Sequence, residues 1–413
     1  MDRPAPLFTP ILIGGCLIVV VSFGARAGFG LFQIPVSETF GWPRADFSMA
    51  IAIQNLCWGN GQPIFGAIAE KLGDRKAILL GIVLYTLGLF ASAFAVSPGA
   101  HQLLNMMIGF GIAGSGFGVI LAMVGRASSD KNRSISLAIA TAAGSAGQVL
   151  VPPVTESLIG GIGWQGTFMV MAAAIAASAL LLPMMKTQPM APKSDLEMSM
   201  GRTLMIAFRD PSYVMIFVGF FSCGYQLGFI TAHFPAFVTE LCGPISPGSM
   251  LESIGISDTS KLGAISLSLI GMANIGGTLL AGWAGNHFTK KYLLAIIYTL
   301  RTVVAATFIL LPITPLTVIV FSVTMGSLWL ATVPLTSGLV GYIYGLRYMA
   351  TLYGFVFFSH QLGGFLGVWL GGRMYDIYGD YTAVWWIGVG VGAFSALVHL
   401  PIREKPNAGL VPA

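Results

Sequence analysis

The stretch GAIAEKLGDRKAIL, residues 66–79, lies between two long apolar runs and has a degraded second copy, GWAGNHFTKKYLL, at residues 282–294. In both copies a glycine ends the first run, a polar cluster forms a short turn, and two basic residues precede a leucine-rich start. The copies begin 216 residues apart in a chain of 413, and the connection at 156–168 is likewise echoed at 371–386. Repeats half a chain apart predict two homologous halves, which are typical of membrane transporters.

The composition of the chain indicates that it lies in lipid. Of its residues 55% are hydrophobic and only 9% are charged, and the mean hydropathy is +0.81. A soluble domain carries about 25% charged residues, so this chain has too few to cover a surface that faces water. A helix that crosses the hydrocarbon core needs about 20 mostly apolar residues. Windows of this kind lie at residues 11–36, 47–69, 77–96, 102–124, 134–157, 163–184, 212–238, 262–285, 291–312, 316–342, 350–373 and 382–401.

These windows predict an all-α polytopic membrane protein with twelve transmembrane helices in two six-helix halves. The longest connection on the inner side is polar and contains prolines, so it divides the chain. We expect an N-terminal six-helix bundle at residues 1–186, a cytoplasmic linker at 187–210 and a C-terminal six-helix bundle at 211–413.

The basic residues of the connections predict the orientation of the chain. With the N-terminus inside, sixteen of the 21 Lys and Arg residues fall in cytoplasmic segments and three in external ones. Because positive charge accumulates on the cytoplasmic side, both termini are expected to be cytoplasmic. The charges therefore mark topology, and no nucleic-acid partner is expected.

Several classes of function lack a motif in this sequence. The start, MDRPAPLFTP, has none of the features of a cleavable signal peptide, so the first apolar run is expected to be a retained helix. Cysteine occurs at Cys16, Cys57, Cys223 and Cys242. These cysteines show no CxxC spacing and are expected to be reduced packing residues, with no metal site. The glycine-rich residues 109–118 lie inside an apolar span, so neither a cofactor nor enzyme activity is expected.

Residues 66–79 resemble the loop motif of the major facilitator superfamily, G-x-L-a-D-r-x-G-r-k-x-x-l. The positions that match are Gly66, Gly73, Arg75 and Lys76. Glu70 takes the place of the usual aspartate and Lys71 that of the arginine, while Asn286 replaces the acid in the second copy. Together with Asp74, this motif is expected to form a conformational latch, in which an acid at one helix end meets the N-terminus and the basic residues of a neighbour. The alternative is a topology signal alone.

Three further stretches are similar to the monocarboxylate transporter family and its bacterial oxalate/formate-type relatives. They are FGARAGFGLFQIPVSETFGW at residues 23–42, DFSMAIAIQN at 46–55 and GGRMYDIYGDYTAVWW at 371–386. The resemblance covers essentially the whole chain. It implies the fold of the superfamily, with a central cavity lined by the first, second, fourth and fifth helices of each half.

Arg26 is one of two basic residues inside the predicted spans. It lies about 22 Å along the first span from Ile11, and a charge at that depth costs at least about 2.5–3.5 kcal/mol. Where mammalian monocarboxylate transporters carry a lysine that is thought to meet the substrate, Arg26 offers a planar bidentate donor for a carboxylate. The alternative is a structural ion pair or a role in capping carbonyl groups.

The eighth span departs from the family pattern. The resemblance implies an acid and, four residues later, an arginine that grips the carboxylate, but Asn274 and Thr278 stand at these places. The anion anchor and its proton-linked partner are thus missing, although Asn274 can orient a polar substrate by hydrogen bonds. Arg301 in the ninth span either has a structural role toward neighbouring helices or replaces the missing arginine as a second basic site.

Polar residues of the other cavity helices complete the predicted substrate site. They are Asn55, Trp58, Gln148, Tyr225, His360 and Gln361. His360 can bind an anion or carry a proton near neutral pH, or be a neutral packing histidine. Glu156, at the outer end of the fifth span, is either a second proton carrier or a hydrated interfacial residue. Polar stripes of this kind also serve as interhelical hydrogen bonds worth about 0.6 kcal/mol each.

The sequence therefore predicts a secondary active transporter that moves a small, monocarboxylate-like organic anion by alternating access, coupled to protons or by exchange. The expected location is the plasma membrane, specifically a bacterial inner membrane, and the expected state is a monomer surrounded by lipid. The alternative is an exporter of drugs or neutral metabolites in which Arg26 is structural. A receptor or scaffold of the same fold is a third possibility, which would be expected to carry an additional soluble domain.

Overall fold

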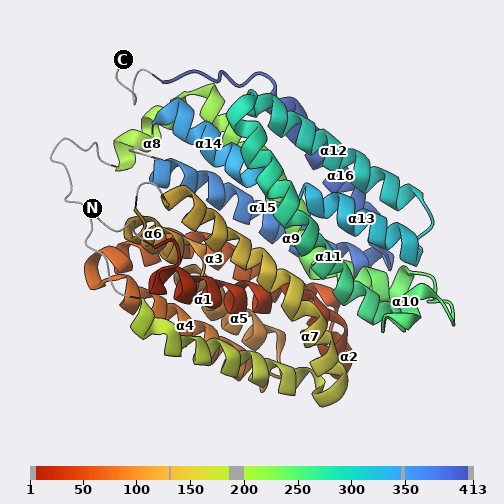
Figure 1. Cartoon of the computed structure of the whole chain (residues 1–413). Coiled ribbons are helices and arrows are strands. Elements are labelled where there is room, and N and C mark those ends of the chain that lie inside the picture. Colours follow the sequence, from red (N-terminus) through yellow and green to blue (C-terminus); the bar gives the residue numbers. More distant parts are fainter. Residues whose placement is uncertain (1–5, 130–131, 186–199, 346–348, 408–413) are drawn as a thin grey trace. The chain divides into compact units, whose positions relative to one another are not determined.

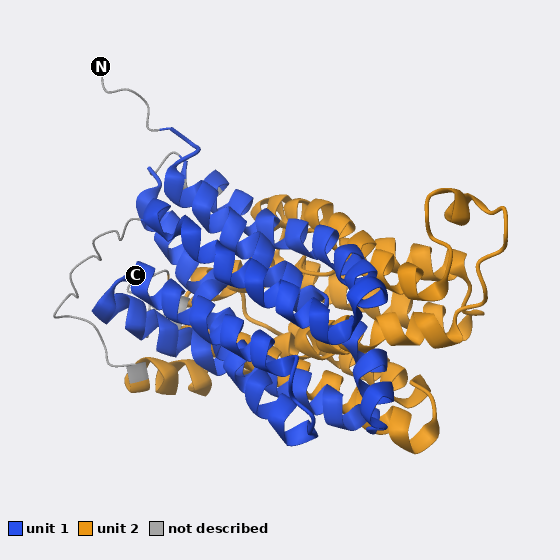
Figure 2. Ribbon diagram, turned by 90° about the horizontal axis from the view of Figure 1, so that it is seen from below, with its two compact units in different colours: residues 1–191 blue, residues 192–413 orange. Residues whose placement is uncertain are grey.

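The computed structural model describes residues 6–129, 132–185, 200–345 and 349–407, and every regular element within these residues is a helix (Figure 1). The chain divides into two compact units, residues 1–191 and 192–413 (Figure 2). Unit 1 contains α1 (Pro10–Ala27), η1 (Phe29–Phe32), α2 (Gln33–Phe40), α3 (Arg44–Leu72), α4 (Asp74–Ser92), α5 (Pro98–Ser115), α6 (Phe117–Ala127), α7 (Arg133–Ala177) and η2 (Ser178–Met184). Unit 2 contains α8 (Met200–Arg209), α9 (Pro211–Leu241), α10 (Met250–Ser253), α11 (Thr259–His287), α12 (Lys290–Leu310), α13 (Pro315–Ser327), α14 (Thr332–Tyr344), α15 (Met349–Tyr378) and α16 (Thr382–His399).

The predicted spans correspond closely to helices. Nine helical stretches among the described residues are long and apolar enough to cross a membrane. The predicted spans 47–69 and 350–373 lie in α3 and α15, which are helical but fall outside these nine. Two other predicted spans both lie in α7, which turns at Gly163, where φ is +73°. The count of twelve crossings and the cytoplasmic termini stay predictions.

Unit 1 is built around the packing of α1 against α7. Two glycines let these helices approach backbone to backbone, because a Cβ at Gly147 would lie 2.2 Å from the carbonyl oxygen of Val20, and one at Gly24 would overlap Val151. The start of α1 is fixed by its cap, since the Thr9 side chain accepts a hydrogen bond from the amide of Leu12. The close approach holds the last turn of α1, which carries Arg26, firmly in place.

Unit 2 is built around α9, which packs along α11, α15 and α16. Its apolar core includes a cluster of rings from Phe234, Phe237, Phe308, Phe321 and Trp385. A second close approach brings α15 onto α9, because a Cβ at Gly224 would lie 1.6 Å from the carbonyl oxygen of His360. This contact places the middle of α15 directly beside the middle of α9.

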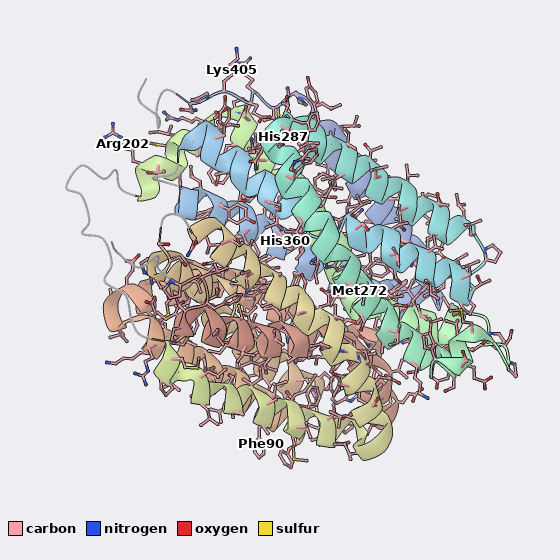
Figure 3. The ribbon with its side chains drawn as sticks, in the orientation of Figure 1. Phe90, Arg202, Met272, His287, His360 and Lys405 are labelled. Atoms are coloured by element: carbon pink, nitrogen blue, oxygen red, sulfur yellow. The ribbon has the colours of Figure 1, made fainter. Side chains whose placement is uncertain are left out.

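Large apolar side chains also cover the outside of each unit. Phe90 on α4 is 50% exposed and extends outward from its helix (Figure 3), and Met272 on α11 is 59% exposed. Exposed apolar side chains on this scale are unfavourable in water and favourable in hydrocarbon. The surfaces of both units therefore suit a lipid environment.

Candidate functional site

Arg26 lies in the last turn of α1 and meets two residues of α3. Its Nη2 donates a hydrogen bond to Oδ1 of Asn55 at 2.9 Å, and its guanidinium carbon lies 4.7 Å from the centre of the Trp58 ring. The side chain is half-buried, and its Nε is buried without a hydrogen-bond partner. No carboxylate of the described residues lies within ion-pair distance of it. The fold thus brings three of the predicted site residues together, and their role in binding substrate stays a prediction.

Side chains that the sequence analysis did not single out complete the surroundings of Arg26. The ring of Phe23 meets that of Trp58 edge to face, with 5.5 Å between the ring centres, and its centre lies 4.0 Å from that of the Phe117 ring on α6. Tyr85 on α4 is fully buried and donates its hydroxyl to the backbone oxygen of Ser22, one turn before Arg26. Aromatic residues in an apolar span give no signal of their own, so only the fold places them beside a cation. An amide and an aromatic face hold the guanidinium while leaving N–H groups for an anion.

The remaining candidates of unit 1 lie on α7. Gln148 is half-buried and directly follows Gly147, the residue at which α7 touches α1. Glu156 is also half-buried, two turns further along the same helix. Gln148 as a substrate ligand and Glu156 as a proton carrier stay predictions.

Asn274 and Thr278 on α11 are engaged at a break between two helices. Oδ1 of Asn274 accepts hydrogen bonds from the Thr278 hydroxyl at 3.0 Å and from the backbone amide of Leu330 at 2.9 Å. Leu330 belongs to the short segment that separates α13 from α14, so its amide has no partner within a helix. Asn274, a predicted substrate ligand, therefore binds the backbone at the break between α13 and α14. The spacing of residues in the sequence does not reveal this contact.

Tyr225 and Gln226 both bind the backbone of α16. The Tyr225 hydroxyl donates to the carbonyl oxygen of Val384 at 3.3 Å, and Nε2 of Gln226 donates to that of Gly388 at 3.0 Å. These contacts fix α9 against α16. The predicted contact of Tyr225 with substrate stays a prediction, while its hydroxyl is already occupied in this structure.

His360 and Gln361 lie together on α15. Nδ1 of His360 is 3.4 Å from Oε1 of Gln361, and the imidazole stacks on Phe357 with a centroid separation of 5.6 Å. Both side chains are buried, and Nε2 of Gln361 has no hydrogen-bond partner. His360 also lies within hydrogen-bonding reach of the Cys223 thiol on α9. A polar cluster therefore exists inside unit 2, with His360 at its edge.

Arg301 on α12 is the centre of this cluster. It is 0% exposed, and its Nη1 donates to Sγ of Cys223 at 3.3 Å. The ring of Tyr298 lies 5.9 Å from its guanidinium carbon. From its sequence context Cys223 is expected to be a packing residue alone, because a single cysteine in an apolar run carries no signal of a charged neighbour from another helix.

Comparison with known proteins places the chain in a family. A model of the Major Facilitator Superfamily matches residues 15–368. The chain belongs to this superfamily. The resemblance that the loop motif at 66–79 indicated is thereby confirmed.

The relatives of the chain are transporters. It is 26% identical over 399 residues to the uncharacterized MFS-type transporter YcxA of Bacillus subtilis (strain 168), a match that covers 93% of this chain and 92% of the relative. It is 24% identical over 396 residues to monocarboxylate transporter 13 of Rattus norvegicus, covering 92% and 85%. Among solved structures, the nucleoside transporter NupG is similar in fold, with a TM-score of 0.77 at 15% identity, covering 95% of this chain and 99% of that one. The chain is therefore a multi-pass membrane protein of a family that transports small molecules.

The superfamily loop motif connects α3 to α4 in unit 1. Gly73 adopts φ +92°, which lets the chain turn sharply before Asp74 begins α4. The Asp74 side chain is 1% exposed, and its Oδ1 accepts a hydrogen bond from Nη2 of Arg126 on α6 at 2.5 Å. Of the other latch residues, Gly66 is half-buried and three are exposed, namely Glu70, Arg75 and Lys76. The buried ion pair of this region therefore joins Asp74 to a residue outside the motif.

The degraded second copy of the motif obtains its carboxylate from another segment. Oε1 and Oε2 of Glu404 accept hydrogen bonds from the backbone amides of Lys290 and Lys291, the first residues of α12, at 3.2 and 3.1 Å. Nζ of Lys291 in turn donates to the carbonyl oxygens of Leu400 and Ile402. A carboxylate at a helix N-terminus is stabilising. Glu404 thus supplies an acid to the loop whose own acid is replaced by asparagine.

The same segment also reaches the start of α9. Asp210 caps this helix and accepts hydrogen bonds from the Ser212 amide, the Tyr344 hydroxyl and Nδ2 of Asn407, at 2.9, 3.0 and 2.9 Å. Burial acts to raise the pKa of Asp210, but the hydrogen bonds from Asn407, Ser212 and Tyr344 outweigh it and hold the pKa below its ordinary value. Asp210 therefore joins α9, α14 and the segment after α16.

Proposed function

We propose that the protein is a secondary active transporter for a small, monocarboxylate-like organic anion, which works by alternating access with proton coupling or exchange. The observation that carries this proposal is Arg26, a half-buried guanidinium whose Nε has no hydrogen-bond partner. The similarity of the chain to monocarboxylate transporter 13 supports the substrate class. Its similarity to a transporter of Bacillus subtilis supports a location in a bacterial inner membrane.

In this proposal Arg26 neutralises the substrate carboxylate. Asn55 holds one edge of the guanidinium through Nη2, and Trp58 covers its face. The N–H groups that remain can form a two-point interaction with a planar carboxylate, which is stronger than a neutral hydrogen bond. A neutral substrate would gain less from this site, because the desolvated cation would stay uncompensated.

Uptake measurements in proteoliposomes test the proposal. The purified protein is assayed with labelled monocarboxylates, dicarboxylates, a sugar and a nucleoside, each with and without an imposed pH gradient. We expect uptake of at least one monocarboxylate, and Arg26→Gln should weaken its apparent affinity about 10- to 100-fold, the value of a charge-assisted hydrogen bond. Arg26→Lys should keep part of the activity because it keeps the charge.

The matched control is Arg202→Gln, an arginine that is exposed on α8. Its uptake should equal that of the unmodified protein. Transport of the neutral compounds alone, or anion uptake that is unaffected by Arg26→Gln, would overturn the proposal and favour the exporter in which Arg26 is structural.

A further inference from the structure

A buried cation without a carboxylate lies inside unit 2. Arg301 is 0% exposed, and no Asp or Glu of the described residues forms an ion pair with it. Its Nη1 donates to Sγ of Cys223, while its Nε and Nη2 are buried without hydrogen-bond partners. An arginine keeps its proton inside proteins, so this charge is not removed by deprotonation. A buried charge with no counter-charge costs several kcal/mol, and the surroundings must supply an anion.

The acidic group in contact with Arg301 is the thiol of Cys223. The neighbouring phenol, Tyr298, faces the guanidinium with its ring, whose centre lies 5.9 Å from the guanidinium carbon of Arg301. Thiols are also ordinarily more acidic than phenols, with reference pKa values of about 8.5 and about 10. A guanidinium in hydrogen-bonding contact favours the charged form of a neighbouring thiol. Cys223 is therefore the best source of the missing negative charge.

Two other polar groups approach the same sulfur atom. The Thr332 hydroxyl at the start of α14 lies 3.3 Å from Sγ of Cys223, and His360 on α15 is within hydrogen-bonding reach. A neutral thiol is a weak acceptor, so a guanidinium donor and two further groups that are able to donate suit a thiolate better. Cys223 is 0% exposed, and its contacts hold it at the meeting point of three helices other than its own.

The titratable groups around the pair come from several helices. From α12 they are Arg301 and Tyr298, from α15 His360 and Tyr353, and from α16 His399, which stacks on Tyr298. The titratable residues of α11, Lys261 and His287, stand near its two ends. None of these groups is a carboxylate, so none competes with Cys223 for the charge of Arg301.

We propose that Cys223 is a thiolate paired with Arg301 at neutral pH, and that it is the group that takes up the coupled proton during transport. The step adds one proton to the thiolate and gives a neutral thiol, with no change of oxidation state. Unit 2 then carries one uncompensated positive charge at Arg301, which is buried. The coupling role rests on the proposed function, whereas the ion pair does not.

Infrared spectroscopy tests the ion pair directly. The S–H stretch falls where no other protein group absorbs, so each cysteine is assigned by the difference between the unmodified protein and its Cys→Ala variant. Cys16, Cys57 and Cys242 should each contribute an S–H band at neutral pH, and they serve as internal controls. Cys223 should contribute none at neutral pH and should gain one on acidification. An S–H band from Cys223 at pH 7 would overturn the ion pair.

Transport measurements test the coupling role. Cys223→Ser replaces the thiol by a hydroxyl that does not ionise, so the pH dependence of uptake should disappear. Cys223→Asp restores an ionisable anion, and its pH profile should reappear at a lower pH because carboxylates are more acidic than thiols. Cys57→Ser, also a buried cysteine, should leave the profile unchanged.

The outcomes separate the two proposals. A pH profile that persists in Cys223→Ser would overturn the coupling role even if the infrared data show a thiolate. If Cys223→Ser does not fold, the infrared bands assigned through the Cys→Ala variants of Cys16, Cys57 and Cys242 still decide the ion pair, because any further S–H band of the unmodified protein belongs to Cys223. Cys223→Asp then decides the coupling. Absence of all organic anion uptake would reject the proposed function, and the coupling role with it, while the S–H measurement would continue to decide the ion pair.

Discussion

Arg26 and Arg301 give the same signal in the sequence, a single arginine inside an apolar span, and they have opposite surroundings in the structure. Arg26 is half-buried against an amide and an indole, with a buried N–H to spare. Arg301 is completely buried and meets a sulfur atom. Exposure thus distinguishes the two arginines, because Arg26 is partly exposed whereas Arg301 is enclosed by other side chains of unit 2.

The largest expected effect separates the two arginines by stability. Arg301→Gln removes one partner of a buried pair and should lower the free energy of unfolding by about 3–5 kcal/mol. Arg26→Gln keeps a hydrogen-bonding group at a half-buried position and should cost less than about 1 kcal/mol while it impairs uptake. Thermal unfolding in detergent measures both, and equal losses of stability would remove the distinction drawn between the two sites.

The next effect concerns the two loop motifs. Arg126→Gln leaves the carboxylate of Asp74 buried without its cation, and we expect a loss of about 3 kcal/mol. The double variant Asp74→Asn/Arg126→Gln should recover much of this loss, because it removes the uncompensated charge. Arg75→Gln is the control, since Arg75 is exposed and should change stability by less than about 0.5 kcal/mol. A double variant no more stable than Arg126→Gln would show that the pair is not the stabilising contact.

A smaller effect is expected in the second loop. Glu404→Gln keeps the shape of the side chain but removes the charge at the N-terminus of α12, which should cost about 1 kcal/mol. Lys405 is an exposed neighbour, so Lys405→Gln should leave the free energy of unfolding unchanged. The comparison with Arg126→Gln tests whether the segment after α16 has taken over the stabilising role of the loop acid. An unchanged free energy of unfolding in Glu404→Gln would show that it has not.

The smallest effect is a pH dependence at Asp210. Because its pKa is held below the ordinary value, its hydrogen bonds stabilise the folded protein fully above the unfolded pKa of about 3.9. This stabilisation is lost as the pH falls through the lower, folded pKa. Asp210→Asn should therefore melt at a lower temperature than the unmodified protein at pH 7, and the difference should shrink toward pH 3. A difference that stays constant with pH would assign the effect to shape and not to charge.

Residue pattern was sufficient for much of the fold. Apolar windows located the helices because lipid demands about 20 apolar residues per crossing. The resemblance of residues 66–79 to a loop motif indicated the superfamily, which the match over residues 15–368 confirms. The breaks were harder to predict, because the segment between α13 and α14 is as apolar as a continuous helix and depends on Asn274 from another helix.

The candidate site shows the same limit at the level of single residues. The sequence placed Asn55 and Trp58 in the same predicted site as Arg26, and both contact it. Arg301 is paired with Cys223, and Asp74 with Arg126. The start of α12 is paired with Glu404. Each of these partners lies on a different element and is remote in sequence, so no local pattern predicts it.

By itself the sequence determined that the chain is a helical membrane protein, and it predicted two related halves and two arginines inside apolar spans, because hydrophobicity and charge are properties of composition and spacing. The tertiary structure decided what each charge contacts. The cost of a buried charge depends on the group that packs against it, and for Arg26, Arg301 and Asp74 that group comes from another helix.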